Sequence, residues 1–449
     1  MSFPPSAFRS ASNWLTTDLS SGPKDQRRHG YAIGVVVLLV GIVIAYFVYG
    51  NIGSHHHQYD LKIYYHAVKF WLDGNSLYDY AQPDLVNMSL GYTYPPIAAL
   101  AMVPMTLLPL GAVIVITFLA IVAANTALTR LFLVERLTLP PFQMMIVTGL
   151  VTAASFDLQP IGLNIAFGQI NVFLALLVVV DILVLGRRGS RWFGVGIGIA
   201  MAIKLTPGIF LVYLVLSKRW RAMAVAVLTA AAAIGLAAVF APSDTVRYYT
   251  RLVWESDRLG FLETTMNQSI NGLLARLASP DNPSRAVWLA CCLVVSVLGI
   301  WRIRTAVAAK DTLAAITLTG FLGVLVSPVS WLHHIIWVVP AAVLLAAYFV
   351  HWRDERAAGS QPSLRRLVPL VVLALTGAFV WFVNTRLMFV LPETEYYRLG
   401  LVKIFQASLQ CIWTVAALLM LPIRRSAPAA AVHTATDSAP SAEGRRRSG

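Results

Sequence analysis

The sequence predicts an all-α polytopic membrane protein, on three observations of composition and pattern. Hydrophobic residues make up 57% of the 449 positions and charged residues only 12%, against about 25% in soluble domains, and the mean hydropathy is +0.68. The apolar residues fall into runs of roughly the twenty positions that a membrane helix needs. The net charge of +14 comes from short Lys and Arg clusters between these runs, as in cytoplasmic loops, so we assign it to topology and not to nucleic-acid binding.

The two ends of the chain differ from this apolar middle. Residues 1–30 and 423–449 are polar and carry Ser and Pro, which predicts disordered tails on either side of a membrane domain at residues 31–422. The first apolar run, Ile33 to Tyr49, is longer than a signal-peptide core and lacks a convincing cleavage site, so we expect an uncleaved first span. The basic residues before it place the N-terminus in the cytoplasm.

Following the apolar runs and their basic flanks gives a consistent topology. Pro104 and Pro109 divide the long run after the first external loop into a short surface or re-entrant helix and a span that ends at Arg136 on the inner side. Further spans are expected at residues 142–156, 170–185, 222–241, 285–301, 313–326, 332–350, 367–383 and 401–421. With the short pair described next, this amounts to about twelve membrane helices, with both termini in the cytoplasm and external loops at residues 51–94 and 242–284.

Residues 193–217 allow two interpretations. A single span would place the basic cluster KRWR, residues 218–221, on the outer side and would invert the topology downstream. Two short helices that break at Lys204 and Pro207 keep this cluster and the preceding RRGSRW on the inner side. We prefer the short, re-entrant-like pair on the positive-inside rule.

Polar clusters interrupt the apolar chain, and the topology puts most of them on or near the external face. They are Asp60 with its neighbouring histidines, GYTYPP at 91–96, LNIAFGQIN at 163–171, IKLTP at 203–207, the loop 248–276 and SPVSWLHH at 327–334. Ionisable residues at membrane depth are costly and indicate function by default. Their gathering on one side predicts a shared cavity that faces away from the cytoplasm.

These clusters carry a resemblance to a known family. The succession DLKIYYHA, LDGNSLYDY, YTYPP, GQIN, KLTP, NQSINGLLAR and SPVSWLHHIIWVVP, from about residue 55 to 345, resembles the polyprenyl-phosphate-mannose-dependent membrane mannosyltransferases of actinobacteria, which have the GT-C fold. The resemblance implies an inverting transfer of mannose from a beta-linked polyprenyl-phosphate mannose to a mannosylated phosphatidylinositol, with an alpha-1,2 linkage formed in cell envelope biosynthesis. Lipomannan-branching mannosyltransferases and arabinofuranosyltransferases of the same fold remain alternatives.

Asp60 is the expected catalytic base. Ten residues separate it from the end of the first apolar run, and it lies in an aromatic, histidine-rich loop. In the resembling family an acidic residue of the first external loop is the base. One carboxylate suffices for this chemistry, because it takes the acceptor proton while the departing phosphate needs little acid help. The alternative is that Asp60 caps a helix that begins at Leu61.

Four cationic or imidazole side chains are the candidates for binding the donor phosphate: His333, His334, Lys204 and Arg258. Imidazoles can donate to phosphate oxygens, although these two histidines also suit an interfacial anchor beside Trp331. Adjacent helix residues cannot both face one pocket. Lys204 either neutralises the phosphate or extends to an interface, and Arg258 is the alternative partner.

Amide, aromatic and acidic side chains of the same clusters are the candidates for sugar and acceptor contacts: Tyr94, Gln169, Asn171, Glu263, Asn267, Gln268 and Trp331. Helix caps and interhelical hydrogen bonds are common alternative roles for amides in membranes. Aromatic residues also form interfacial belts, and acidic loop residues often form a solvated face.

No cofactor and no metal are expected. The chain has no G-x-G-x-x-G unit or P-loop and no Asp-x-Asp motif, which favours a lipid-linked donor over a nucleotide sugar. His55, His56 and His57 with Asp60 would permit a metal site, but consecutive histidines rarely converge on one ion. An alternative from another class is a secondary transporter or lipid flippase, in which Asp60 and Lys204 would couple transport. The expected partners are the two lipid substrates and the bilayer.

Overall fold

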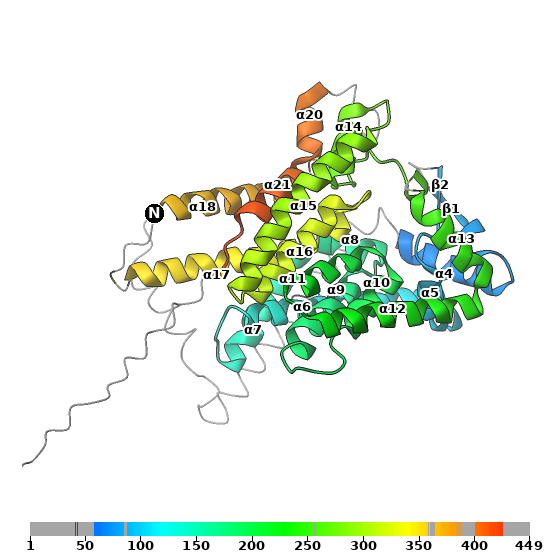
Figure 1. Cartoon of the computed structure of the whole chain (residues 1–449), viewed down its shortest axis with the longest axis horizontal. Helices are drawn as coiled ribbons and strands as arrows, with labels where there is room; N and C mark the ends of the chain where they lie inside the picture. Colours follow the sequence, from blue (N-terminus) through cyan, green and yellow to red (C-terminus); the bar gives the residue numbers. More distant parts are fainter. Residues whose placement is uncertain are drawn as a thin grey trace, which may run out of the picture.

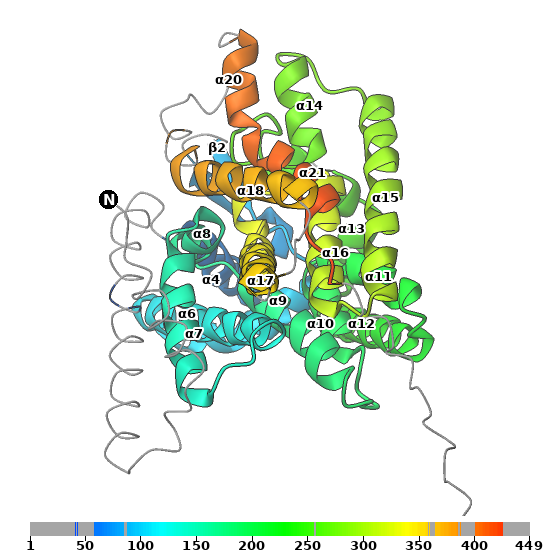
Figure 2. The ribbon, with the colours of Figure 1, turned by 90° about the vertical axis from the view of Figure 1, so that its left-hand side faces the viewer.

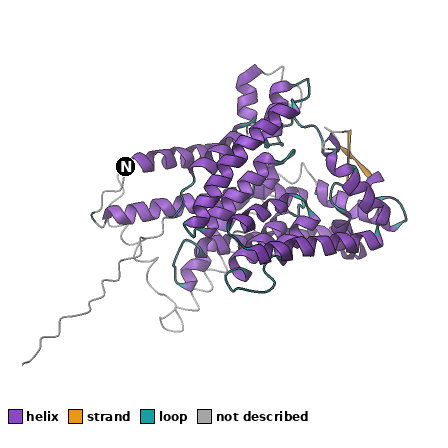
Figure 3. Ribbon diagram, in the orientation of Figure 1, coloured by secondary structure: helices purple, strands orange, loops and turns teal. Residues whose placement is uncertain are grey.

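The computed structural model describes residues 41, 43, 58–84, 88–255, 257–357, 359, 364–384, 387 and 400–424. This part of the chain is a bundle of helices (Figures 1, 2 and 3). Both predicted tails, except residues 423 and 424, lie outside the described residues, as do His55 to His57 and nearly all of the predicted first span. The all-α prediction missed one antiparallel hairpin, β1 (Ala81–Asp84) and β2 (Met88–Gly91), in which Ala81 pairs with Gly91.

The helices follow one another along the chain with short breaks at proline, glycine and polar residues. The α-helices are α4 (Tyr59–Leu72), α5 (Pro96–Met102), α6 (Leu110–Val134), α7 (Pro141–Phe156), α8 (Gln159–Phe167), α9 (Asn171–Val180), α10 (Val195–Ile203), α11 (Phe210–Leu216), α12 (Trp220–Phe240), α13 (Pro242–Thr250), α14 (Ile270–Ala278), α15 (Arg285–Ala308), α16 (Thr312–Val326), α17 (Val338–Ala357), α18 (Leu364–Ala378), α20 (Gly400–Ala407) and α21 (Leu409–Met420). Short 3-10 or π segments include η4 (Val103–Leu107), η5 (Asp181–Leu185), η6 (Thr206–Ile209), η9 (Leu332–His334) and η10 (Phe379–Asn384).

The described residues form a polytopic membrane protein. Four of their helices are long and apolar enough to cross a membrane: α6, α12, α15 and the segment Leu367–Asn384. The number rises to six if each of two bent pairs counts as one span: α7 with α8, bent by 74°, and α20 with α21, bent by 56°. The predicted total of about twelve is therefore not confirmed, because several predicted runs fold as helices too short to span. Leu289, Leu293 and Val297 of α15 are more than half exposed at four-residue spacing, as on a lipid-facing helix.

Contacts between loops agree with the predicted relative sidedness. Glu135 forms an ion pair with Arg187, and Arg136 forms one with Asp311. The Asp311 carboxylate also accepts the backbone N–H of Arg424 at 2.7 Å. All of these positions fall in or beside loops that the topology assigns to the inner side, so the fold brings these inner loops to one end of the bundle.

The segment 193–217 is broken at Lys204, as predicted. Lys204 has an extended backbone (φ −147°, ψ 130°) after α10, and η6 and α11 follow it. A Cβ added at Gly194 would lie 2.2 Å from the carbonyl oxygen of Ala222, and one at Gly198 would lie 2.5 Å from that of Ala226. Helices α10 and α12 therefore pack closely and start at the same end of the bundle. Because α12 crosses from that end, α11 must first return to it, which supports the short pair.

This arrangement predicts the labelling of two engineered cysteines in a background without the three native ones. A cysteine at Phe261, in the loop after α13, should react with a membrane-impermeant maleimide in intact cells. A cysteine at Ser217, at the end of α11, should react only after the cells are opened, because α11 returns to the basic inner face. Labelling of Ser217→Cys in intact cells would instead favour a single span at residues 193–217.

Candidate active site

The start of α4 is fastened to the end of α8, and this contact places Asp60. The side-chain amide of Gln58 donates to the carbonyl oxygen of Ile165 at 2.6 Å, and its backbone N–H donates to that of Ala166 at 3.1 Å. Gly168 has φ +67°, and a Cβ there would lie 2.6 Å from both Gln58 Oε1 and Leu61 Cβ. Glycine is therefore required on steric and conformational grounds. This close approach brings the following residue, Gln169, against α4.

Asp60 lies in the first turn of α4, not at its cap. The N-cap position belongs to Gln58, so the interpretation of Asp60 as a cap is wrong. The side-chain amide of Gln169 donates to Asp60 Oδ2 at 2.6 Å, whereas Oδ1 accepts no hydrogen bond from any residue that the structure describes. Burial raises the pKa of Asp60 to about 6, and the Gln169 hydrogen bond and the charge of Lys204 partly offset this rise. Asp60 can therefore act as a base above this pKa, through the oxygen to which no described residue donates.

Gln169 connects Asp60 to a buried network of polar side chains. Its Oε1 atom accepts from Tyr64 OH at 3.1 Å, Tyr94 OH at 3.2 Å and Asn171 Nδ2 at 3.3 Å. The phenol oxygens of Tyr64 and Tyr94 are 2.9 Å apart. The fold therefore unites three predicted site residues, Tyr94, Gln169 and Asn171, with Asp60.

Lys204 reaches the same network from the break after α10. It is 8% exposed, and its Nζ atom lies 2.8 Å from Asn171 Oδ1, 2.9 Å from His334 Nε2 and 3.4 Å from Tyr94 OH. Within the described part of the chain no carboxylate lies within ion-pair distance of this ammonium. A buried charge is normally paired, so an ammonium held by neutral groups alone is suited to bind an anion.

The two adjacent histidines have different surroundings. His334 contacts Lys204, and because an ammonium only donates, Nε2 of His334 accepts and the ring proton belongs on Nδ1. That Nδ1 atom has no hydrogen-bond partner among the described residues, so it can donate to an anion. His333 is 4% exposed, with its ring against Phe167 at 5.5 Å, and its carbonyl oxygen accepts from Asn164 at 2.8 Å. The structure therefore brings His334 to Lys204, and the His333 ring packs against that of His334 with 4.7 Å between centroids.

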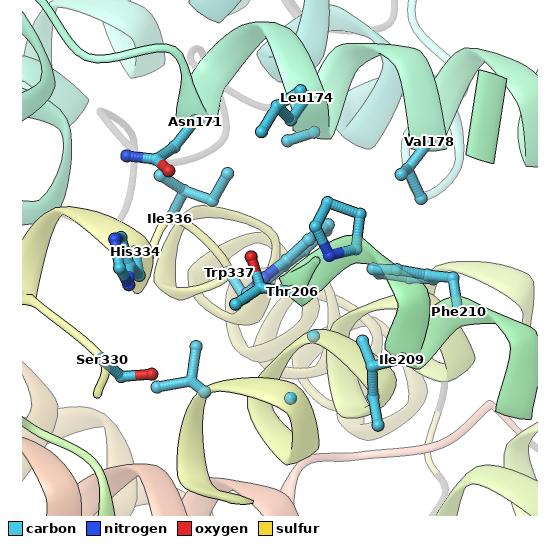
Figure 4. A pocket seen from close by; sticks show the side chains of 15 residues that line it. Asn171, Leu174, Val178, Thr206, Ile209, Phe210, Ser330, His334, Ile336 and Trp337 are labelled. Carbon is cyan, nitrogen blue, oxygen red and sulfur yellow. The ribbon is translucent and has the colours of Figure 1, made fainter. Parts of the chain in front are cut away.

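An apolar pocket adjoins this cluster. Its walls come from α9, η6, α11, α16 and the segment around η9. Figure 4 shows Asn171 and His334 at one end of the pocket and Val178 and Phe210 at the other. Gly320 is required in this wall, because a Cβ there would lie 2.2 Å from the ring of Trp337. The site thus combines a polar end with an apolar interior.

Arg258 is not joined to this cluster by any contact within the described residues. Its guanidinium donates to the carbonyl oxygens of Tyr92 at 3.2 Å, Thr93 at 3.1 Å and Leu252 at 3.1 Å. It also lies over the rings of Tyr78 and Tyr248 at 5.9 and 5.7 Å. These contacts fasten the loop that carries Tyr94 and give Arg258 a structural role, and its use as a phosphate ligand stays a prediction.

Asn267 and Gln268 are fully buried and serve the fold in the same way. Asn267 Oδ1 accepts from Ser330 N at 3.0 Å, and its residue forms a β-bridge with Trp331. The Gln268 amide donates to Ala407 O at 2.7 Å and accepts from Cys411 N at 3.0 Å. Both amides are thereby held by backbone groups. The structure gives no contact that joins Glu263 or the Trp331 side chain to Lys204, so these two remain predictions.

Three residues of the network were missed from the sequence. Tyr64 lies four positions after Asp60 on α4, a spacing that places both on one helix face and was a usable signal. No local sequence pattern indicates Gly168 or Asn164. The role of Gly168 depends on its contact with α4, and that of Asn164 on its contact with His333. No group of three or more metal-ligating side chains occurs within the described residues, which exclude the three histidines before Gln58.

Known proteins similar to this chain fit the chemistry of the site. A model of glycosyltransferase family 87 matches residues 92–328, which contain Gln169 and Lys204 but neither Asp60 nor His334. The polyprenol-phosphate-mannose-dependent alpha-(1-2)-phosphatidylinositol mannoside mannosyltransferase of Mycobacterium tuberculosis is 33% identical over 76% of this chain and 79% of that protein. The corresponding phosphatidylinositol pentamannoside mannosyltransferase of Mycolicibacterium smegmatis is 32% identical over 61% of this chain and 66% of that protein.

An alpha-(1->3)-arabinofuranosyltransferase of Mycobacterium tuberculosis is 29% identical over 43% of this chain and 43% of that protein. No solved structure matches the chain significantly. The alternative of a secondary transporter or lipid flippase finds no support in these similarities. Since the family model covers more than half of the chain and a relative at 33% identity covers three quarters of it, the chain belongs to glycosyltransferase family 87.

Proposed function

We propose that this membrane enzyme transfers mannose from polyprenyl-phosphate mannose to a mannosylated phosphatidylinositol and forms an alpha-1,2 linkage. The observation that carries the proposal is the buried ammonium of Lys204. Among the described residues only neutral side chains contact it, and two amides connect it to the carboxylate of Asp60. Transfer from a sugar phosphate to an alcohol needs a cation for the phosphate and a base for the hydroxyl. One site supplies both.

The chemical step follows from these positions. Asp60 Oδ1 takes the proton of the acceptor hydroxyl while the hydroxyl oxygen forms a bond to the anomeric carbon of mannose. The bond between that carbon and the donor phosphate oxygen breaks, and the phosphate leaves with the electron pair. Lys204 and the Nδ1–H of His334 stabilise its charge, which is strongest as the bond breaks. Attack opposite to the leaving phosphate inverts the anomeric carbon.

The apolar pocket supports a donor that carries a lipid. It extends from His334 and Asn171 toward Phe210, so a phosphate held at Lys204 can direct an attached hydrocarbon chain into the pocket (Figure 4). Burial of each CH₂ group there contributes about 0.8 kcal/mol. A nucleotide would find no comparable set of polar partners in that pocket.

The acceptor and linkage follow the relatives. The two mannosyltransferases named above match a larger share of the chain than the arabinofuranosyltransferase does, 76% and 61% against 43%. This favours a mannosylated phosphatidylinositol over the arabinofuranosyl or lipomannan-branching alternatives. The identities of 33% and 32% do not separate a shorter mannoside from a pentamannoside acceptor.

We further propose the GT-C architecture, with about twelve membrane helices in a domain at residues 31–422 and with both termini in the cytoplasm. The inner loops that meet around Asp311 support this orientation, because the positive-inside rule places their arginines in the cytoplasm. Asp60 and Gln169 then lie toward the opposite, external face. The cell membrane is the expected location, with the reaction on its outer side.

The test is an assay with purified protein, radiolabelled polyprenyl-phosphate mannose and a panel of phosphatidylinositol mannosides. We expect transfer to at least one of these acceptors, and digestion with a linkage-specific mannosidase should release the label as an alpha-1,2-linked residue. Activity should survive EDTA, because a monophosphate can be held by Lys and His donors without a metal ion. Loss of activity in EDTA with recovery in Mn²⁺, or turnover of GDP-mannose without lipid, would contradict the proposal.

A further inference from the structure

We propose that Gln169 is a positioning residue, which holds the Asp60 carboxylate so that Oδ1 faces the acceptor hydroxyl, and that the charge of Lys204 orients this amide through Asn171. The proposal rests on the proposed function of the site. It assigns Gln169 a role different from the sugar contact that its residue type predicts.

The orientation of Asn171 is fixed by Lys204. The ammonium lies 2.8 Å from Asn171 Oδ1, and since an ammonium only donates, the oxygen of this amide must face it. The amide nitrogen is then turned the other way. There it donates to Asn164 Oδ1 at 3.1 Å and to Gln169 Oε1 at 3.3 Å.

The orientation of Gln169 follows from that of Asn171. Its Oε1 atom accepts from Asn171 and from the hydroxyl groups of Tyr64 and Tyr94, so its amide nitrogen faces Asp60. The 2.6 Å hydrogen bond to Oδ2 results. A flipped amide would set its oxygen against the carboxylate and its N–H groups against the Asn171 amide nitrogen. Two amides thus connect a cation to an anion, each with its donor end toward the anion.

Burial keeps this arrangement rigid. Gln169 is 3% exposed and Asn171 is 7% exposed, and Gly168 holds the backbone of the first against α4. Three donors already surround Gln169 Oε1, which leaves it little capacity to accept from a sugar hydroxyl. One carboxylate oxygen is thus fixed while the other accepts from no described residue, which is the geometry that a general base requires.

The hydrogen bond has an electrostatic effect that can be measured. The charges that act on Asp60 are those of Lys204, which lowers its pKa, and Asp84, which raises it; the phenols of Tyr59, Tyr64 and Tyr94 are nearby and neutral at ordinary pH. The Gln169 hydrogen bond favours the ionised carboxylate. Its removal therefore moves the pKa of Asp60 upward, above about 6.

The first test needs no substrate. The carboxyl band of protonated Asp60 is identified in infrared difference spectra as the band that Asp60→Asn removes, and its pH titration is followed. Gln169→Met should move the midpoint upward by about one unit, because one charge-assisted hydrogen bond is lost. Gln169→Asn, whose amide is one methylene too short to reach Asp60, should do the same if the Met variant folds poorly. Gln143→Met, which removes another fully buried amide on α7, should leave the midpoint unchanged. An unchanged midpoint in both Gln169 variants overturns the proposal.

The second test separates positioning from sugar contact by kinetics. Gln169→Met should lower kcat by roughly tenfold to a hundredfold with both KM values nearly unchanged, because misplacement of a base impairs the reaction and not binding. Added to Asp60→Asn, the same change should cost nothing more, since Gln169 acts only through Asp60. If the double variant instead lost more activity than Asp60→Asn alone and the KM rose, Gln169 would contact the sugar. A protein that transfers no mannose, but whose Asp60 midpoint responds to Gln169, would refute the proposed function alone.

Discussion

Asp60→Asn is expected to lower turnover by about a hundredfold or more, while binding of the lipid-phosphate donor is kept. The amide has no basic oxygen to take the acceptor proton, and loss of a general base costs about 10²- to 10⁴-fold. In the wild type, kcat/KM should fall below pH about 6 as Asp60 becomes protonated. The measurement is single-turnover transfer of radiolabelled mannose across pH 4.5–8, roughly 1.5 units below and 2 units above that pKa. The Asn variant should lack this fall in kcat/KM at low pH.

The control for this variant is Asp79→Asn, the same change at a more than half-exposed side chain that pairs with Arg247. It should keep normal turnover.

The ionisation of Asp60 also affects the stability of the fold. The folded protein binds the Asp60 proton more tightly than an unfolded chain does. The ionised carboxylate therefore destabilises the fold above pH about 6, whereas below pH about 4 Asp60 is protonated in both states and this loss of stability is absent. Asp60→Asn should therefore melt no lower than the wild type at neutral pH. Wild-type turnover in this variant would remove Asp60 from the mechanism.

Lys204→Met is expected to raise the KM for the donor by about a hundredfold, which corresponds to roughly 3 kcal/mol for an anion that loses its buried cation. Met fills a similar volume without the charge that lowers the pKa of Asp60, so the variant should move this pKa above about 6. The fall in kcat/KM at low pH should then begin at a higher pH. The measurements are the donor KM, the acceptor KM and the pH profile. The acceptor KM should change far less than the donor KM.

Lys310→Met is the matched control, because Lys310 is exposed in the turn between α15 and α16 beside the inner-loop residue Asp311. It should leave both KM values as they are. The Lys204 variant should not melt at a lower temperature in the absence of substrates, since it removes a buried charge that no described carboxylate contacts. An unchanged donor KM would show that the phosphate binds elsewhere, and Arg258 would then be the next candidate.

The features that could be predicted from the sequence are those that depend on the residue type at one position and its immediate neighbours. The break at Lys204 followed from a charge and a proline within an apolar run, and the fold realises it because the extended backbone of Lys204 ends α10. The prominence of Asp60 followed from its place just after an apolar run. Its N-cap alternative failed because Gln58, anchored to α8, takes the cap position instead.

Other features depended on partners that no local pattern records. The buried amide of Gln268 has the same residue type whether it faces a sugar or a backbone, and its partner Ala407 lies 139 positions away. The guanidinium of Arg258 likewise satisfies carbonyl groups 165 and 166 positions earlier. The predicted number of spans is not confirmed, because runs near Phe156 and Ala407 bend sharply into shorter helices.

The attachment of α4 to α8 bears on how the enzyme is made. Asp60 and Gln169, which share a hydrogen bond, are 109 positions apart, and Lys204 and His334 are 130 positions apart. At about 5–20 residues per second, synthesis of Gln169 follows that of Asp60 by roughly 5–20 s. Throughout that interval the carboxylate has neither its amide partner nor its cation. On the mechanism proposed above, catalytic competence arises late in biogenesis, after the ribosome has passed His334. A nascent chain stalled before that point would then insert helices without being able to transfer sugar.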